Sequence, residues 1–271
     1  MSDRIKEYYD RSVRYEWKRV VQDAYHRLEF ETTVRFLKKY LPKKGLILDA
    51  GGGPGRYSIE FAKRGYDVVL LDLAPANLEF AKKQIKKAKV QNRVKGIVAG
   101  SIVDLSMFPS NMFDAVVCLG GPLSHVEGKG KRDKALSELV RVAKKNAPIF
   151  VNVFSRIGVI MGAPRYFSHE IAITKHFKEL VERGEDYMWR QKYYAHFFMP
   201  EELEEFFAGK EVKVIETVGL EGISSRFKEE INRLARNQKA WKNWLAAHYR
   251  LCTHPAVVAT SEHVLVICRK I

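Results

Sequence analysis

The chain alternates between short, almost continuously apolar runs and longer segments whose apolar residues recur at helical spacing. Between residues 46 and 154, five apolar runs are typical of strands: 46–48, 68–71, 94–98, 113–119 and 148–154. The segments with the period of amphipathic helices are 56–64, 77–89 and 131–144. Apolar strands that alternate with helices indicate a parallel sheet with both faces covered.

The pattern differs on either side of this alternating region. Residues 1–41 are predicted to form two helices, which end at the breaker cluster Pro42-Lys-Lys-Gly45. After residue 154 we expect an insertion with at least one helix, near 171–183, and a short helix at 200–207. Two more strands and one long amphipathic helix are expected at 212–218, 263–269 and 227–249. The fold class is therefore α/β: a doubly wound, mostly parallel, seven-stranded sheet with helical insertions.

A glycine-rich loop directly follows the first strand. Asp49, Gly51, Gly53 and Gly55 alternate with other residues, and a helix begins at once. Glycines permit tight turns and let backbone N–H groups approach a ligand closely. Asp72 ends the next strand, where a carboxylate can accept hydrogen bonds from the two hydroxyls of a ribose. This order of elements predicts a nucleotide-type ligand, for which NAD and S-adenosylmethionine compete.

The acid that starts the loop separates these two ligands. An NAD site favours G-x-G-x-x-G without an acid, whereas this loop begins with Asp49. With the stretch LDAGGGPGRYSIEFAKRGYDVVLLDLAPANLEFAKK, the chain resembles the class I S-adenosylmethionine-dependent methyltransferases of small-molecule type. The resemblance covers residues 46–154 and extends to the final strands. It implies a Rossmann-like fold, S-adenosyl-L-methionine as the cofactor and S-adenosyl-L-homocysteine as the product.

The resemblance also implies roles for single residues. Asp49 would organise the loop, and Gly51 and Gly53 would pass beneath the methionine and the ribose. Asp72 would hold the ribose hydroxyls. Further cofactor contacts are implied at Gly55, Leu73, Ser101, Ile102, Leu119 and Gly120. Ser101 departs from the family pattern, in which an Asp often binds the adenine amino group.

Methyl transfer from a sulfonium is an in-line displacement, which needs positioning and water exclusion rather than a metal or a covalent nucleophile. His125 follows the fourth strand, at the sheet edge where ligands bind, and it titrates near neutrality. It is our candidate base or substrate-positioning residue, with a packing role as the alternative. Candidate substrate contacts come from the aromatic and basic residues outside the core: Tyr8, Tyr15, Arg27, Tyr194, His196 and His263.

We expect one domain of 271 residues with four consecutive parts. They are an N-terminal helical lid (1–41), a cofactor-binding core (42–154), a cap insertion (155–199) and a C-terminal part (200–271) that contains a helical insertion at 221–262. An enclosed pocket under such a lid and cap favours a small-molecule acceptor.

The formal net charge of +15 leaves a second substrate class open. A basic surface is typical of nucleic-acid binding, so an RNA methyltransferase, acting on tRNA above all, is the first alternative. The basic residues are spread over many helices, which favours a Lys-rich surface such as that of a protein from a thermophile. A non-catalytic S-adenosylmethionine-binding protein is the second alternative.

Cysteine usage and hydropathy bear on the compartment. Three cysteines without metal-type spacing, a charged N-terminus and the lack of any run of 18 apolar residues predict a reduced, cytoplasmic setting with no membrane partner.

Overall fold

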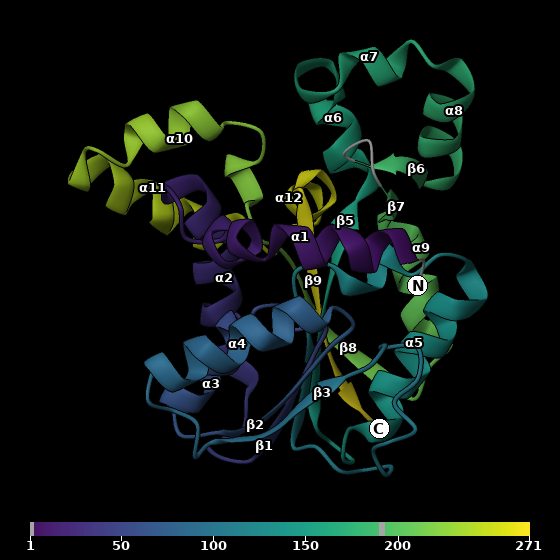
Figure 1. Cartoon of the computed structure of the whole chain (residues 1–271). Coiled ribbons are helices and arrows are strands. Elements are labelled where there is room, and N and C mark those ends of the chain that lie inside the picture. Colours follow the sequence, from purple (N-terminus) through teal and green to yellow (C-terminus); the bar gives the residue numbers. More distant parts are fainter. Residues whose placement is uncertain (1–2, 190–192) are drawn as a thin grey trace.

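A nine-stranded sheet runs through the computed structural model, which describes residues 3–189 and 193–271 (Figure 1). The strands are β1 (Leu46–Ala50), β2 (Asp67–Asp72), β3 (Val94–Ala99), β4 (Ala115–Cys118), β5 (Pro148–Ser155), β6 (Glu185–Trp189), β7 (Tyr193–Phe198), β8 (Val212–Gly219) and β9 (His263–Lys270). The order β3-β2-β1-β4-β5 is parallel, and β9 pairs antiparallel with both β5 and β8. The predicted fold class, a doubly wound α/β sheet, is confirmed. The sheet has nine strands, whereas seven were expected.

Helices cover both faces of this sheet. On one face lie α2 (Ala24–Tyr40), α3 (Arg56–Lys63) and α4 (Pro75–Lys87). On the other face lie α5 (Lys129–Val142) and α9 (Pro200–Ala208). The result is a three-layer arrangement of helices, sheet and helices.

Two apolar cores fill the spaces between these layers. Successive residues of β4 alternate between them, since Val117 packs with α2, α3 and α4 whereas Val116 and Cys118 pack with α5 and α9. Strand β9 alternates in the same way, with Leu265 in the first core and Val266 in the second. Burial on both faces explains why these strands are apolar at nearly every position.

Helix α1 (Asp3–Arg19) runs across the molecule between the sheet and the segment 156–183 (Figure 1, purple). Two contacts attach it to the core. The Asp10 carboxylate accepts a hydrogen bond from the Ala76 N–H in the first turn of α4, at 3.0 Å. The Arg56 guanidinium lies over the Trp17 ring, with its central carbon 4.0 Å from the ring centroid, and the same ring packs against Phe80.

The cap insertion contains helices and also a β-hairpin that the sequence analysis did not predict. After α6 (Arg156–Tyr166), α7 (Ser168–Ile171) and α8 (Thr174–Arg183), strands β6 and β7 form an antiparallel pair. Strand β7 then pairs parallel with the last two residues of β5, beyond the point where β4 ends. The expected count of seven strands is therefore wrong, because it leaves out the two strands of this hairpin.

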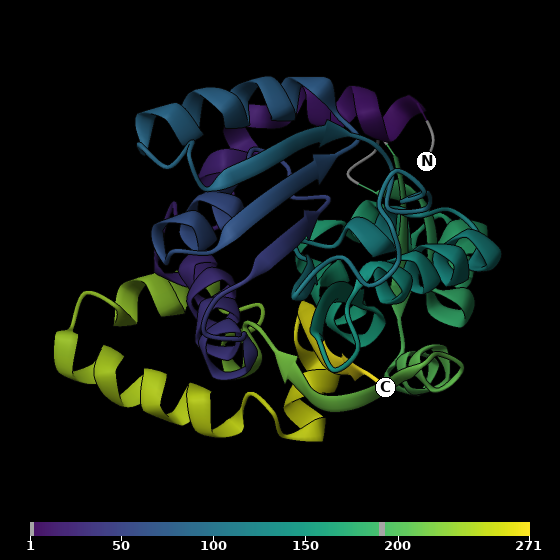
Figure 2. The same cartoon turned by 90° about the horizontal axis from the view of Figure 1, so that it is seen from below.

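The region predicted as one helix at 227–249 forms two. Helix α10 (Lys228–Leu234) ends before Asn237, whose side chain accepts a hydrogen bond from the Ala240 N–H at 3.0 Å and so starts α11 (Gln238–Leu251). Figure 2 shows both helices, in yellow-green, beside α2. The remaining short helices are α12 (Pro255–Thr260), η1 (Pro122–His125) and η2 (Gly222–Ser224).

Across residues 3–189 and 193–271, no helix combines the length and the apolar character that a membrane crossing requires.

Candidate active site

The glycine loop turns sharply at the carboxyl end of β1. Gly51, Gly53 and Gly55 have φ angles of +76°, +55° and +81°, in the left-handed region that favours glycine. A Cβ atom at Gly51 would lie 2.6 Å from Cγ of Pro122. The loop therefore brings bare backbone to the edge of the sheet, where a side chain would close the space.

Asp72 lies beside this loop at the end of β2. Its Oδ2 accepts a hydrogen bond from the Gly53 N–H at 2.8 Å, and its Oδ1 accepts from the Ala74 N–H at 2.9 Å and from Asn77 Nδ2 at 3.1 Å. Burial raises the pKa of Asp72, against the lowering effect of these three donors. The donors hold the carboxylate in place while it still forms part of a cavity wall.

Asp49 lies under the loop and does not line the cavity. Its Oδ2 accepts a hydrogen bond from Ser58 Oγ at 2.7 Å, while Oδ1 has no hydrogen-bond partner among the described residues. Burial raises the pKa of Asp49 to about 7. A Cβ atom at Gly52 would lie 2.5 Å from the Asp49 carboxyl, so the two are in close contact. This placement suits a residue that supports the loop from below.

A cavity opens above the loop. Most of the predicted cofactor residues line it; they are Gly51, Gly53, Asp72, Leu73, Ser101, Ile102, Leu119 and Gly120. Gly55, like Asp49, lies outside it, as the residue that precedes α3. Helix α1 closes the cavity from above with Ile5, Lys6 and Tyr9.

A second, larger cavity adjoins the first, and we call it the acceptor cavity. The two share the residues Tyr9, Glu16, Arg19, Gly120 and His125. The cap and the C-terminal part supply most of the other residues of the acceptor cavity, including Tyr166, Phe167, Glu170, Tyr193, Phe197, Arg226, Glu262 and His263.

His125 lies at the boundary of the two cavities, as a predicted candidate base would. Its side chain is buried, with Nδ1 3.2 Å from the Tyr194 carbonyl oxygen. The ring packs edge-on against Phe154, Tyr193 and Tyr9, at centroid distances of 5.1, 5.2 and 5.9 Å. These contacts fix the orientation of the imidazole relative to both cavities.

Two of the predicted substrate contacts line the acceptor cavity. Tyr15 does so from α1, and His263 does so from the start of β9. His263 Nδ1 lies 2.6 Å from Glu221 Oε1. Burial alone would lower the pKa of His263, but the Glu221 and Glu29 carboxylates raise it overall.

The other four predicted substrate contacts lie outside both cavities. Arg27 is exposed on α2, and Tyr8 packs against the Tyr193 ring at 4.5 Å. Tyr194 and His196 point away from the cavities because β7 is a strand, in which successive side chains face opposite sides.

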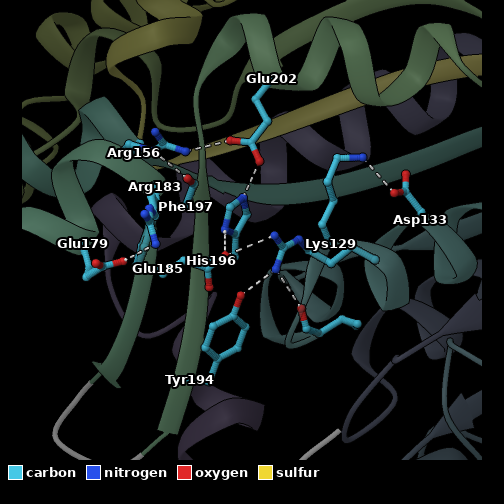
Figure 3. Close-up of polar contacts among 12 residues, drawn as sticks. Lys129, Asp133, Arg156, Glu179, Arg183, Glu185, Tyr194, His196, Phe197 and Glu202 are labelled. Carbon is cyan, nitrogen blue, oxygen red and sulfur yellow. Dashed lines mark hydrogen bonds and ion pairs between the residues drawn. The ribbon is translucent and has the colours of Figure 1, made fainter. Parts of the chain in front are cut away.

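Tyr194 and His196 belong instead to a buried polar network, which Figure 3 shows. His196 lies between two carboxylates, with Nδ1 3.2 Å from Glu185 Oε1 and Nε2 2.6 Å from Glu202 Oε1. Tyr194 Oη accepts a hydrogen bond from Arg132 at 2.5 Å. Burial raises the pKa of Glu185, but hydrogen bonds from His196 and Tyr194 outweigh it and lower that pKa to about 2. The network connects β6 and β7 to α5 and α9.

The sequence analysis missed the charged residues of the acceptor cavity. Arg19 bonds Glu16 and Glu29, and Arg226 bonds Glu262, so each charge is already paired within the chain. These residues lie in helical or loop segments with no motif around them, and only the tertiary structure brings them together.

A glycine loop and an acid at the end of the second strand, on a doubly wound sheet, define a Rossmann-like domain for a nucleotide-type ligand. Residues 47–146 match the family model described as a methyltransferase domain. Over that segment the chain is therefore similar to methyltransferase domains, which supports the predicted resemblance to the class I S-adenosylmethionine-dependent methyltransferases.

Similar proteins agree on the class and differ in the acceptor. A glycine/sarcosine N-methyltransferase from Aphanothece halophytica is 27% identical over 124 residues, which cover 46% of this chain and 45% of that protein. A ubiquinone biosynthesis O-methyltransferase from Xanthomonas oryzae pv. oryzae is 25% identical over 174 residues, which cover 64% and 65%. The chain thus spans about half the length of the first relative and less than two thirds of the second.

A solved structure supports the fold over most of the chain. A SAM-dependent methyltransferase from Methanosarcina mazei aligns with a TM-score of 0.59 at 20% identity, covering 87% of this chain and 97% of that one. The helical lid and the cap therefore accompany a fold that extends well beyond residues 47–146.

Proposed function

We propose that this protein is an S-adenosylmethionine-dependent methyltransferase that transfers the methyl group to a small molecule held in the acceptor cavity. One observation carries the proposal: a cavity built on the glycine loop and Asp72 adjoins a second cavity, and the two share Gly120 and His125. In-line transfer requires donor and acceptor to meet at such a boundary.

The residues of the first cavity fit the cofactor. The bare backbone at Gly51 leaves space where a Cβ atom would collide, and the Asp72 carboxylate faces the same space. Asp72 would hold the ribose hydroxyls, and Leu73 and Ile102 would flank the adenine. When bound, S-adenosylmethionine supplies an activated methyl group on a sulfonium.

The chain itself would position the acceptor and exclude water. Helix α1 covers the cofactor cavity, and the aromatic rings around His125 form an apolar part of the boundary. His125 is our proposed base or substrate-positioning residue, since its ring is held by packing and lines both cavities.

We favour a small molecule over RNA, and a cytoplasmic location. The names of both relatives refer to small molecules, and the acceptor cavity is lined on several sides by the lid and the cap. The three cysteines are buried and unbridged, which suits a reducing compartment. A thermophilic source is a further proposal, based on the Lys-rich surface alone.

Transfer of a labelled methyl group tests these proposals. The protein is incubated with methyl-labelled S-adenosylmethionine and a cell extract, which is then separated into RNA, protein and small molecules. We expect label in the small-molecule fraction. Label in RNA would favour the tRNA alternative, which also predicts tight, salt-sensitive binding to bulk tRNA. Binding of the cofactor in calorimetry without any transfer would favour a non-catalytic binding protein.

A further inference from the structure

The charge inside the acceptor cavity is opposite to the charge of the whole molecule. The chain carries a net charge of +15, but carboxylates surround this cavity. Three of them line it directly, namely Glu16, Glu170 and Glu262. Two more lie directly behind the wall, since Glu29 is bonded to Arg19 and Glu221 to His263.

Among the described residues, two guanidinium groups line the acceptor cavity with these carboxylates, and both are already paired within the chain. Arg19 donates to Glu16 at 3.3 Å and to Glu29 at 3.0 Å. Arg226 donates to the Gly158 carbonyl oxygen at 2.8 Å and forms an ion pair with Glu262 at 3.3 Å. These five carboxylates therefore outnumber the two guanidinium groups and His263 taken together.

Glu262 and Glu170 lie in the part of the acceptor cavity that is not shared with the cofactor cavity. Both line the acceptor cavity and neither lines the cofactor cavity. Glu262 comes directly before β9, and Glu170 lies in α7 of the cap with its Oε2 3.2 Å from His176 Nε2. Neither carboxylate is therefore explained by the positive charge of the sulfonium.

Aromatic rings complete the wall of this cavity. They are Tyr9, Tyr15, Phe154, Tyr166, Phe167, Tyr193 and Phe197. Aromatic faces attract cations, and the attraction increases when water is excluded. Carboxylates together with aromatic faces favour an ammonium group over a carboxylate or a phosphate, because here the carboxylates outnumber the guanidinium groups.

We infer that the acceptor is a small amine, bound as its ammonium form in the acceptor cavity and methylated on nitrogen. The inference rests on the proposed methyltransferase function. The ammonium first gives a proton to water. The nitrogen lone pair then forms the N–C bond while the C–S bond breaks, and sulfur keeps that electron pair. One proton is released for each methyl group transferred, so atoms and charge balance.

Matched probes test the charge preference without relying on turnover. An amine, an alcohol and a carboxylate are compared on each of three skeletons: phenethyl, indolylethyl and n-hexyl. Binding is measured by calorimetry with the protein saturated in S-adenosylhomocysteine. On at least one skeleton we expect the amine to bind at least about tenfold more tightly than the alcohol, with the carboxylate weakest. An amine that is nowhere preferred would overturn the inference.

Charge-neutral variants show where the preference arises. Glu262→Gln is expected to weaken amine binding by about tenfold and to leave alcohol binding unchanged. Glu170→Gln gives an independent measurement if the first variant folds poorly. The control is Glu229→Gln, an exposed glutamate of α10 outside both cavities. If both cavity variants bind the amine as the control does, the carboxylates do not select it.

The same calorimetry distinguishes a failure of the proposed methyltransferase function from a failure of the amine inference. If S-adenosylhomocysteine does not bind, the proposed function fails, and the amine inference fails with it. If it binds and the amine is not preferred, the inference alone fails.

Discussion

Among single residues, Asp72 has the most direct part in the proposed cofactor site. Its carboxylate is fixed by three donors and faces the cavity, so removing it would remove both proposed ribose contacts and the support of the Gly53 N–H. We expect Asp72→Ala to weaken S-adenosylhomocysteine binding by about 100-fold, as for the loss of two hydrogen bonds to a charged group.

Calorimetry of the Asp72→Ala variant checks this prediction. Asp67→Ala is the matched control, since Asp67 lies at the opposite end of the same strand and is partly exposed. Unchanged affinity in Asp72→Ala, with the control also unchanged, would contradict the assignment of the ribose to this carboxylate.

Asp49 makes stability depend on pH. Its pKa is about 7 in the folded chain because of burial, and about 3.9 when unfolded, so the folded state binds its proton more tightly. Stability from this group is therefore highest at low pH and falls as pH rises from about 4 to 7, by at most about 1.4 kcal/mol per pH unit.

The variant Asp49→Asn should remove that dependence. Denaturant unfolding at pH 5, 6 and 7 should show a smaller loss of stability with pH in the variant than in the parent. Ser58→Ala is a useful comparison, because it removes the hydroxyl that donates to Asp49 and should extend the dependence to higher pH. Parallel pH profiles for parent and Asp49→Asn would show that Asp49 does not titrate in this range.

The sequence pattern around single residues was enough to predict the cofactor loop, but it was not enough to predict which residues line the acceptor cavity. The spacing from Asp49 to Gly55 and the position of Asp72 are fixed within two strands and one helix, so they could be predicted from the sequence. Glu262 and Arg226 lie in separate segments, and only the fold brings them together. His196 could not be assigned either, because its orientation depends on β7 being a strand.

Among the elements, the hairpin β6–β7 is attached to α9 by a polar cluster at its base. His196 bonds one carboxylate on β6 and another on α9, at Glu185 and Glu202. His196→Ala would leave both without this partner. We expect a loss of about 2 kcal/mol in stability, less than for a fully buried pair because the carboxylates are partly exposed.

Urea unfolding measures this loss. Arg183→Ala serves as control, since Arg183 pairs with Glu179 on the surface of α8 and should contribute no more than about 0.5 kcal/mol. If both variants lose the same amount, the buried network contributes no more than a surface pair.

Element type was predictable wherever the periodicity was clear, which includes the parallel strands and the helices around them. The hairpin was missed because Tyr193–Phe198 is apolar at almost every position and so has no period-two pattern. The break before α11 was missed because it depends on one cap at Asn237, inside a segment whose apolar residues continue at helical spacing.

For the whole molecule, the cofactor should hold the lid in place. Helix α1 lines both cavities and is attached to the core through Asp10 and Trp17. We expect saturating S-adenosylhomocysteine to slow proteolysis within α1 several-fold, since binding stabilises the state with the lid closed.

Trp17→Ala should speed this cleavage and weaken cofactor binding, because it removes the contacts with Arg56 and Phe80. Mass spectrometry of timed digests locates the cuts, and Trp241→Ala, on α11, controls for general destabilisation. Equal cleavage of α1 with and without S-adenosylhomocysteine would show that cofactor binding does not stabilise the lid.

The shortness of β4 determines where the cap can pair with the sheet. Because β4 stops at Cys118, the last two residues of β5 have an open edge, and the cap joins the sheet only there. A different segment between Ser155 and Pro200 would find the same edge for pairing, while the glycine loop on β1 would be unaffected. The cap side of the acceptor cavity is therefore attached to the sheet separately from the glycine loop, while the lid and the C-terminal part form other sides of the cavity.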